Sequence, residues 1–203
     1  MAVTFKGKAS FTPLVARTIT FVTSNKGKLH EASTKLAPLG YHVVGADLDP
    51  TEIQADSLAE VARAKCEVLV GRLQAPFFVD DGGLFVDHYA GFPGVYSAHA
   101  LRTIGVDGIL RLMRDVPPAD RAAYFAAVIG YHDGARVHTF AGRVDGHLAT
   151  APHSDGHGFG FDPIFVPAGH DKTFAQLPAE TKNTLSHRGM ALDALVAHLE
   201  AQP

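Results

Sequence analysis

Two lysines and a glycine directly follow a buried apolar run near the N-terminus. The run ITFV, residues 19–22, has the character of a strand, and the segment TSNKGK, residues 23–28, leads from it into a helical pattern. Backbone N–H groups at a helix start, together with the helix dipole, attract anions. Lys26 and Lys28 add positive charge where acidic residues are favoured. The segment therefore favours a phosphate site.

An ordinary solvated loop in which Ser24 or Asn25 caps the helix is the alternative. The segment is not a Walker A loop, because its glycine spacing is wrong and Leu29 stands where Ser or Thr would hold magnesium. The candidate phosphate-binding residues are Thr23, Ser24, Asn25, Lys26, Gly27 and Lys28.

Two adjacent acids follow the buried strand predicted at residues 77–79. We expect Asp80 and Asp81 at the carboxyl end of this strand, where open α/β sheets bind ligands, with at most one aimed into a given site. Gly82 and Gly83 would then allow a ligand to approach the backbone. Carboxylates near phosphate repel it unless a hard cation such as Mg²⁺ lies between them. Glu52 is a candidate second carboxylate, with a solvated surface acid as the alternative.

The stretch GFGFDP, residues 158–163, flanks aromatic rings with glycines, which suits stacking on a planar base. It lacks the third glycine and following helix of a dinucleotide fingerprint. A turn with Phe161 packed in the core is the alternative. We interpret His153 and His157 as surface histidines rather than a metal pair, because no further ligands match them.

A second helix start carries the same unusual charge. In KNTLSHRG, residues 182–189, Ser186 is the expected N-cap of the last helix, and His187 and Arg188 occupy its first turn. Two helix starts with cations in an acidic protein favour a shared site for a polyphosphate or an electron-rich base edge. Lys182 lies just before this start.

The elements that must position these groups alternate between two-residue and helical spacing. Strands are predicted at 19–23, 41–45, 77–79, 84–86, 124–131 and 137–142. Helices are predicted from the junction 24–28 to Gly40, after Ser57, at 107–114 and at the C-terminus. Asp133-Gly134 marks a tight hairpin, and Ser57 with Glu60 forms a capping box. This order predicts an α/β protein with a mixed sheet.

The helix after residue 57 has a clear buried stripe. Its members are Leu58, Val61, Ala62, the stem of Lys65, Val68 and Leu69. We interpret Cys66, the single cysteine, as an apolar face residue of this helix rather than a nucleophile or zinc ligand.

Composition limits the classes of function. The 203 residues are 46% hydrophobic, with a formal net charge of −3, so a domain with a sizeable core is expected and a nucleic-acid polymer is a disfavoured partner. No apolar run reaches the length of a membrane span, and we expect a cytoplasmic protein without a membrane partner. Residues 1–17 resemble a loose basic arm, with organelle targeting as a weaker alternative, and 18–203 form a single domain.

Five stretches, in their order and spacing, resemble the family of inosine/xanthosine triphosphate pyrophosphatases. They are TSNKGK, FVDDGGLFVDHYAGFPGVYSA, GHGFGFDPIF, KTFAQL and KNTLSHRGMAL. The resemblance covers residues 18–200. It implies an elongated α/β fold of two lobes around a long mixed sheet with a central cleft, and a homodimer. It also implies magnesium-dependent hydrolysis of non-standard purine nucleoside triphosphates (ITP, dITP, XTP) to the monophosphate and pyrophosphate.

The resemblance also implies roles for individual residues. Residues 23–28 would cradle the triphosphate, and Glu52 with Asp81 would hold magnesium, Asp81 also serving as general base for the attacking water. The base pocket would be Phe159, Gly160, Phe161 and Asp162, with Lys182, His187 and Arg188 contacting the nucleotide. Donors such as His187 and Arg188 would pair with a 6-oxo purine and leave the 6-amino group of adenine unpaired.

The chain departs from the family pattern at two positions. Gly82 replaces the usual Ser or Thr after the catalytic acid and leaves only a backbone N–H to contact substrate. His99 stands where many members have Arg. The functional alternatives are a phosphohydrolase that releases orthophosphate and a non-catalytic nucleotide-binding module, which the missing hydroxyl at Gly82 slightly favours.

Overall fold

The computed structural model describes residues 17–48, 50–156 and 158–201. The predicted N-terminal arm lies outside these ranges except for Arg17, which begins the first strand. Within them, no helix has the length and apolar character needed to cross a membrane. The single-domain boundary at residue 18 stays a prediction.

Six strands and six α-helices make up the described chain. The strands are β1 (Arg17–Val22), β2 (Tyr41–Ala46), β3 (Phe77–Val86), β4 (Ala122–His132), β5 (Val137–Leu148) and β6 (Phe165–Pro167). The helices are α1 (Lys26–Leu36), α2 (Leu58–Leu69), α3 (Ser97–Thr103), α4 (Gly105–Leu112), α5 (Ala179–Leu185) and α6 (His187–Glu200). The sequence patterns did not predict the short elements α3, α5 and β6.

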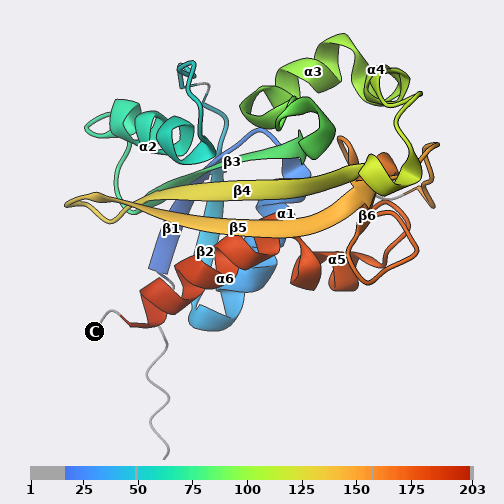
Figure 1. Ribbon diagram of the computed structural model, residues 1–203. Helices are drawn as coiled ribbons and strands as arrows, with labels where there is room; N and C mark the ends of the chain where they lie inside the picture. The colour runs from blue at the N-terminus through green and yellow to red at the C-terminus, as the bar shows by residue number, and fades with distance from the viewer. Residues whose placement is uncertain (1–16, 49, 157, 202–203) are drawn as a thin grey trace, which may run out of the picture.

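One mixed sheet joins all six strands in the order β2-β1-β3-β4-β5-β6 (Figure 1). β1 runs parallel to both β2 and β3, and the remaining neighbours are antiparallel. The predicted α/β architecture with a mixed sheet is confirmed. The two-lobed outline that the resemblance implies stays a prediction.

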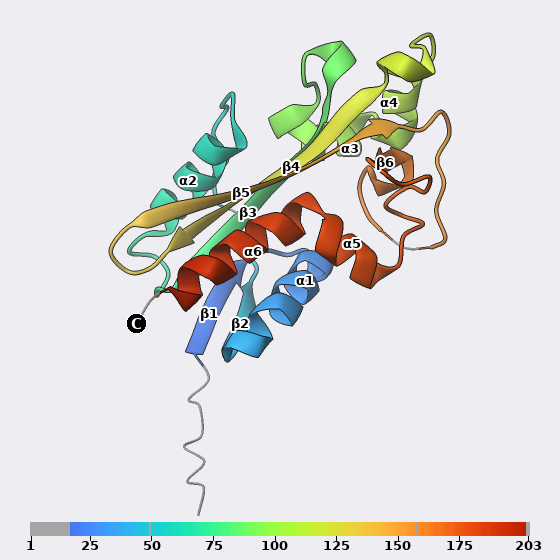
Figure 2. The same cartoon turned by 60° about the horizontal axis from the view of Figure 1, so that its bottom comes forward.

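The helices cover the two faces of this sheet. Figures 1 and 2 show α2 on one face and α1 with α6 on the other. Alternation along β3 explains the division, because Phe77 and Val79 pack in the α2 cluster whereas Phe78 packs in the cluster of α1 and α6. The same alternation must therefore send Asp80 towards α6 and Asp81 towards α2.

The predicted end of β3 is wrong. We expected strands at 77–79 and 84–86, separated by the two acids and two glycines, but β3 is continuous and pairs with β4 from Phe77↔His132 to Val86↔Ala123. Pairing along the whole ladder overrides the weak strand preference of glycine. Asp80 and Asp81 consequently lie in the middle of a strand rather than at its end.

β1, not β3, ends beside these acids. The β1–β3 pairing stops at Phe21↔Phe78. Farther along the same edge of β3, the Leu84 N–H donates a hydrogen bond to Ser97 Oγ at 2.8 Å. The intervening edge of β3 is therefore free of a neighbouring strand. Since alternate residues direct their N–H groups to the same edge, the Gly82 N–H faces this gap.

Several helix starts agree with the sequence predictions. Ser57 and Glu60 form the expected capping box at α2, and Ser186 caps α6 by accepting from Gly189 N–H. Cys66 is fully buried on α2, as predicted, and burial raises the pKa of its thiol to about 12. Val68 is 36% exposed, so its place in the buried stripe is wrong.

The predicted Asp-Gly hairpin joins β4 to β5. Asp133 Oδ1 accepts hydrogen bonds from the N–H groups of Ala135 and Arg136, and Gly134 adopts a φ of 107°, which favours glycine. Both strands are longer than the sequence pattern indicated.

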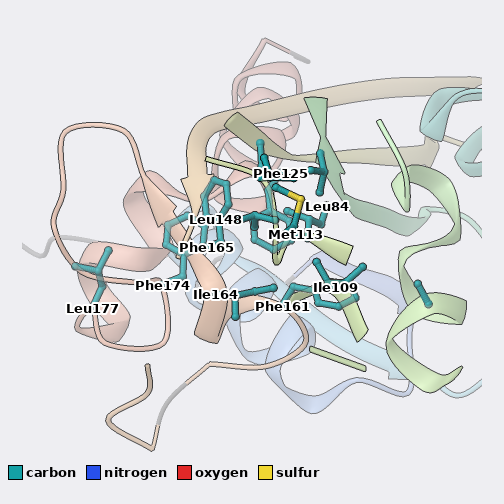
Figure 3. Packing of buried hydrophobic residues seen from close by; sticks show 14 residues of the cluster. Leu84, Ile109, Met113, Phe125, Leu148, Phe161, Ile164, Phe165, Phe174 and Leu177 are labelled. Carbon is teal, nitrogen blue, oxygen red and sulfur yellow. The ribbon is translucent and has the colours of Figure 1, made fainter. Parts of the chain in front are cut away.

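A third apolar cluster packs around the C-terminal end of β3 and the N-terminal end of β4 (Figure 3). Phe161 belongs to it and is 3% exposed, together with Phe125, Phe165 and Phe174. The alternative that places Phe161 in the core is therefore the one observed.

Candidate active site

A cavity of about 340 Å³ lies beside the open edge of β3, between the end of β1, the start of α1, the loop 159–162 and the start of α6. Most predicted site residues line it: Thr23, Ser24, Asn25, Lys28, Glu52, Gly82, Phe159, Gly160, Phe161, Asp162, His187 and Arg188. The open edge explains how segments far apart in sequence meet at one place.

Four predicted site residues do not line the cavity: Lys26, Gly27, Asp81 and Lys182. Lys26 is exposed at the first position of α1. The other three contact residues that do line the cavity, as described below. The structure therefore gathers all the predicted site residues except Lys26 into or around one cavity.

The start of α1 is capped by a side chain and also lines the cavity. Asn25 is the N-cap, and its Oδ1 accepts from the N–H groups of Gly27 at 2.9 Å and Lys28 at 3.1 Å. Thr23 Oγ1 in turn accepts from the Asn25 N–H at 3.1 Å. The N–H groups of Gly27 and Lys28 are thus already satisfied, so attraction of an anion here depends on the dipole and on the Lys28 side chain.

One cation at each helix start, Lys28 and Arg188, has a counterion within the protein. Arg188 donates from Nε to Asp80 Oδ2 at 2.5 Å and from a terminal nitrogen to Glu31 at 3.1 Å. Lys28 Nζ lies 3.3 Å from Asp80 Oδ2 and donates to the Asp80 carbonyl at 3.3 Å. The inference that these cations lack an anion is therefore wrong for Arg188, which two carboxylates neutralise.

Asp80 is a permanently charged buried acid. Burial alone would raise the pKa of its carboxyl, but Arg188 and Lys28 outweigh burial and hold that pKa well below its usual range. Its Oδ1 is buried and has no hydrogen-bond partner among the described residues. Asp80 lines the cavity and holds Lys28 beside it.

Asp81 faces the opposite side of β3 and meets Lys65 of α2. Lys65 Nζ donates to Asp81 Oδ1 at 2.9 Å and to Glu52 Oε1 at 2.5 Å, so one ammonium joins the two carboxylates predicted to hold metal. Of the two acids only Asp80 lines the cavity, in agreement with the expectation that at most one of them aims into a given site, and Asp81 borders it through Lys65. Lys65 and Glu52 line the cavity itself.

Lys65 was not predicted as a site residue. The sequence signal was present, because Lys65 occupies a position on the buried stripe of α2, between Ala62 and Leu69. A lysine at such a position needs a buried partner for its ammonium.

The surroundings of Asp81 suit a base. Burial raises the pKa of the Asp81 carboxyl above its ordinary value, although Lys65 opposes this rise. Its Oδ2 is buried and has no hydrogen-bond partner among the described residues. One oxygen of Asp81 is thus held by Lys65, and the other is left to accept a proton or bind a cation.

The donor set fits magnesium only if substrate completes it. No group of three or more His, Cys, Asp or Glu side chains in the described chain is placed to hold a metal ion. Glu52 and Asp81 provide two carboxylates that already share a cation, and Asp81 Oδ2 is unpartnered. Magnesium commonly takes one or two carboxylates plus waters and substrate phosphates, so these residues fit that mode of binding.

The loop 158–162 presents one aromatic ring to the cavity. Phe159 is 37% exposed and lines the cavity, whereas Phe161 also lines it but is 3% exposed and packs in the core. Gly158 has a φ of 85°, and a Cβ there would lie 2.9 Å from Asp162 Oδ2, so both backbone and space require glycine. The Phe159 ring also packs near Gly27, since a Cβ at Gly27 would lie 3.7 Å from it.

Buried charges fix this loop. Asp162 Oδ2 accepts from the Phe159 N–H at 2.7 Å and from Lys182 Nζ at 2.6 Å. Lys182 Nζ lies 4.4 Å from the Phe159 ring centroid, and the Arg188 guanidinium carbon lies 5.4 Å from it. Lys182 therefore acts on the cavity through Asp162 and Phe159 rather than by lining it.

His187 is buried at the start of α6 and stacks on Phe125, with ring centroids 4.8 Å apart. Burial, together with the neighbouring Arg188, lowers the pKa of its imidazole well below 6.5, so it is neutral at pH 7. Its Nδ1 is buried without a hydrogen-bond partner in the described chain. A neutral imidazole can donate or accept one hydrogen bond at each nitrogen.

The two departures from the family pattern have different surroundings. A Cβ at Gly82 would meet Ala126 O at 3.2 Å and His187 Nε2 at 3.5 Å, so the missing side chain borders His187. His99 is exposed on α3 and does not line the cavity. Gly83 is required for packing as well, because a Cβ at this position would lie 2.2 Å from Gly94 O.

His153 is exposed, as predicted, and its suggested partner His157 lies outside the described residues.

Comparisons with known proteins show what this chain is similar to. A family model described as the Ham1 family matches residues 19–198. A protein of Thermococcus kodakarensis named dITP/XTP pyrophosphatase is 52% identical over 174 residues, which cover 86% of this chain and 92% of the relative. A Pyrococcus horikoshii protein of the same name is 43% identical over 90% of this chain and 96% of its own length. The structure of the Staphylococcus aureus Ham1 protein matches with a TM-score of 0.80 and 31% identity, covering 92% of this chain and 100% of that one.

Proposed function

The chain belongs to the Ham1 family, and from this premise we propose that it hydrolyses non-standard purine nucleoside triphosphates such as dITP, XTP and ITP to the monophosphate and pyrophosphate. The curated relatives named dITP/XTP pyrophosphatase support this class of enzyme and substrate. The observation that carries the proposal is the placement of Glu52, Lys65 and Asp81 beside a cavity that also holds Lys28 and Phe159.

The triphosphate binds at the start of α1. Lys28, held by Asp80, and the dipole of α1 attract its negative charge, while Asn25 keeps the first turn rigid. The Gly82 N–H at the open edge of β3 is a further donor for phosphate. Preorganised donors of this kind stabilise charge that develops on departing pyrophosphate.

Asp81 accepts a proton from the attacking water. The water oxygen bonds to the α-phosphorus, the bond from that phosphorus to the bridging oxygen breaks, and this oxygen leaves with the pyrophosphate. Asp81 Oδ2 is the acceptor, because it has no hydrogen-bond partner among the described residues. A raised carboxyl pKa makes Asp81 a better base than an ordinary aspartate.

We propose magnesium as the cofactor, held by Glu52 and Asp81. When bound, it supplies positive charge to the phosphate oxygens and lowers the cost of bringing them near two carboxylates.

The purine stacks on the exposed ring of Phe159, and His187 is the candidate donor to its 6-oxo group. We revise the role of Arg188, because its bonds to Asp80 and Glu31 favour positioning of the site over direct contact with the base edge. We retain the homodimer as part of the proposal.

The direct test is release of pyrophosphate and orthophosphate from dITP, XTP, ITP, GTP and ATP, with and without magnesium. We expect magnesium-dependent pyrophosphate release from dITP, XTP and ITP, with kcat/KM at least tenfold lower for ATP. Orthophosphate as the product would support the phosphohydrolase alternative. Tight binding of ITP without any hydrolysis would support the nucleotide-binding module.

A further inference from the structure

Lys65 holds the position between Glu52 and Asp81 that a divalent cation would take in the proposed function. Its Nζ lies 2.5 Å from Glu52 Oε1 and 2.9 Å from Asp81 Oδ1, both within hydrogen-bond distance. We propose that Lys65 competes with the metal, so that the free protein binds a divalent cation weakly and the cation enters with the triphosphate as the ammonium leaves. This inference rests on the proposed function and adds an order of binding to it.

The two cations cannot occupy this place together. Magnesium binds carboxylate oxygens at about 2.1 Å, and an ammonium bonded to the same oxygens fills the space between them. Repulsion between the two positive charges would add to the steric conflict. Lys65 would therefore have to leave Glu52 Oε1 and Asp81 Oδ1 before these two oxygens could hold a metal, whereas Asp81 Oδ2 is available from the start.

The charge of the cavity wall gives a metal ion on its own little attraction. Five carboxylates and four cations lie in and around the cavity, so the wall is close to neutral. They are Glu31, Glu52, Asp80, Asp81, Asp162, Lys28, Lys65, Lys182 and Arg188. The metal offsets part of the negative charge of the triphosphate, so the two together meet less repulsion from the carboxylates than the triphosphate would meet alone.

The local structure allows the exchange. Glu52 lies on a segment, residues 50–56, that has no helix or strand, and its side chain is 63% exposed. Its bond to Lys65 is therefore easily replaced by bonds to water or metal. Lys65 itself lines the cavity, so its ammonium can turn from the carboxylates towards a bound phosphate while its stem stays packed on α2.

Titration of the nucleotide-free full chain with Mn²⁺, followed by the electron paramagnetic resonance signal of the free ion, tests this exchange without turnover. We expect Lys65→Met, and Lys65→Gln as a second neutral variant, to bind Mn²⁺ at least tenfold more tightly than the unchanged protein. Lys65→Arg keeps the charge and should bind as weakly as the unchanged protein. The matched control is Lys35→Met, which removes a lysine paired with Asp193 away from the cavity and should change nothing.

Circular dichroism shows whether each variant is folded, and Lys65→Met combined with Asp81→Asn should lose the gain in affinity. Equal Mn²⁺ affinity of the unchanged protein and both neutral variants would overturn the proposal, as would a gain that survives Asp81→Asn. Pyrophosphate release is measured separately. Its absence would refute the proposed function, whereas the Mn²⁺ comparison reports on Lys65 alone.

Discussion

Asp80 and Asp81 are neighbours in sequence with opposite surroundings. Arg188 and Lys28 hold the pKa of Asp80 well below its usual range in a buried network, whereas burial raises the pKa of Asp81 against the opposing effect of Lys65. In the proposed mechanism, the different environments give the two carboxylates different roles: Asp80 positions cations and Asp81 takes a proton. Alternation along β3 produces this difference by sending the two side chains to opposite faces.

The network around Asp80 gives a prediction about stability. Asp80→Asn leaves buried Arg188 with Glu31 as its carboxylate partner, and breaking a buried pair of this kind costs about 3 kcal/mol. Asp193→Asn is the matched control, because it breaks the exposed pair with Lys35 and should cost less than about 1 kcal/mol. Urea unfolding of both variants measures the difference. Equal losses of unfolding free energy would contradict a structural role for Asp80.

At the residue scale, the sequence indicated which side chains carry chemistry better than it indicated their partners. The cations at the two helix starts suggested that an anion binds there, but Asp80 of the protein itself already pairs with Lys28 and Arg188. No local pattern links Arg188 to Asp80, since the two are joined only by the fold. Lys65 could have been found from its place on a buried stripe, but the partner of its ammonium could not.

At the scale of elements, the close contact between α6 and β5 positions His187 and Arg188. A Cβ at Gly142 of β5 would lie 2.1 Å from His187 O and 2.7 Å from Ala191 N, so only glycine allows α6 to approach. We expect Gly142→Ala to cost about 3 kcal/mol of stability and to lower kcat/KM at least tenfold, because the start of α6 must shift.

Gly45→Ala on β2 is the control for this change. Its Cβ would meet only the end of the flexible Leu29 side chain, at 2.9 Å, and should cost less than about 1 kcal/mol with little effect on activity. Thermal unfolding and steady-state kinetics measure both variants. Normal activity of Gly142→Ala would show that the position of α6 does not control the site.

The far end of α6 predicts a dependence of stability on pH. His198 lies 4.5 Å from the His138 ring, and burial followed by repulsion from His138 lowers the pKa of His198 below 6.5, with Arg136 acting in the same direction and Asp133 opposing it. The unfolded chain therefore binds this proton more readily than the folded chain, and stability falls as pH drops through about 6.5.

His198→Gln should make the unfolding midpoint less sensitive to pH between 7 and 5. Neutral His187 also lowers the stability at acid pH, but it does so equally in every variant, so the comparison isolates the effect of His198. His30→Gln, at an exposed position of α1, is the control and should keep the original slope. An unchanged slope in His198→Gln would contradict the effect.

Helix caps and long periodic elements could be predicted from the sequence, whereas the continuity of β3 and the existence of short elements could not. The capping box of α2, the cap of α6 and the Asp-Gly hairpin follow from local chemistry, and the structure has all three. The Asp-Asp-Gly-Gly stretch looked like a strand end, because its strand character comes from pairing with β4. Elements as short as β6 and α5 carry too few periods to be predicted.

For the molecule as a whole, the proposed function depends on the early end of one strand of the sheet. β1 ends at Val22 while β3 continues to Val86, and the gap between them brings the starts of α1 and α6, Lys65 of α2 and the loop 158–162 to one cavity. The mixed sheet was predictable from the order of elements, but this gap was not, since it depends on where the β1–β3 pairing stops.

In the proposed mechanism, Asp81 activates water for attack on the α-phosphorus, and hydrolysis of ITP in ¹⁸O-labelled water shows which phosphorus is attacked. We predict ¹⁸O in the inosine monophosphate and unlabelled pyrophosphate, with turnover of Asp81→Asn lowered at least about a hundredfold while ITP still binds. Label in the pyrophosphate, release of orthophosphate, or undiminished turnover of Asp81→Asn would contradict the account.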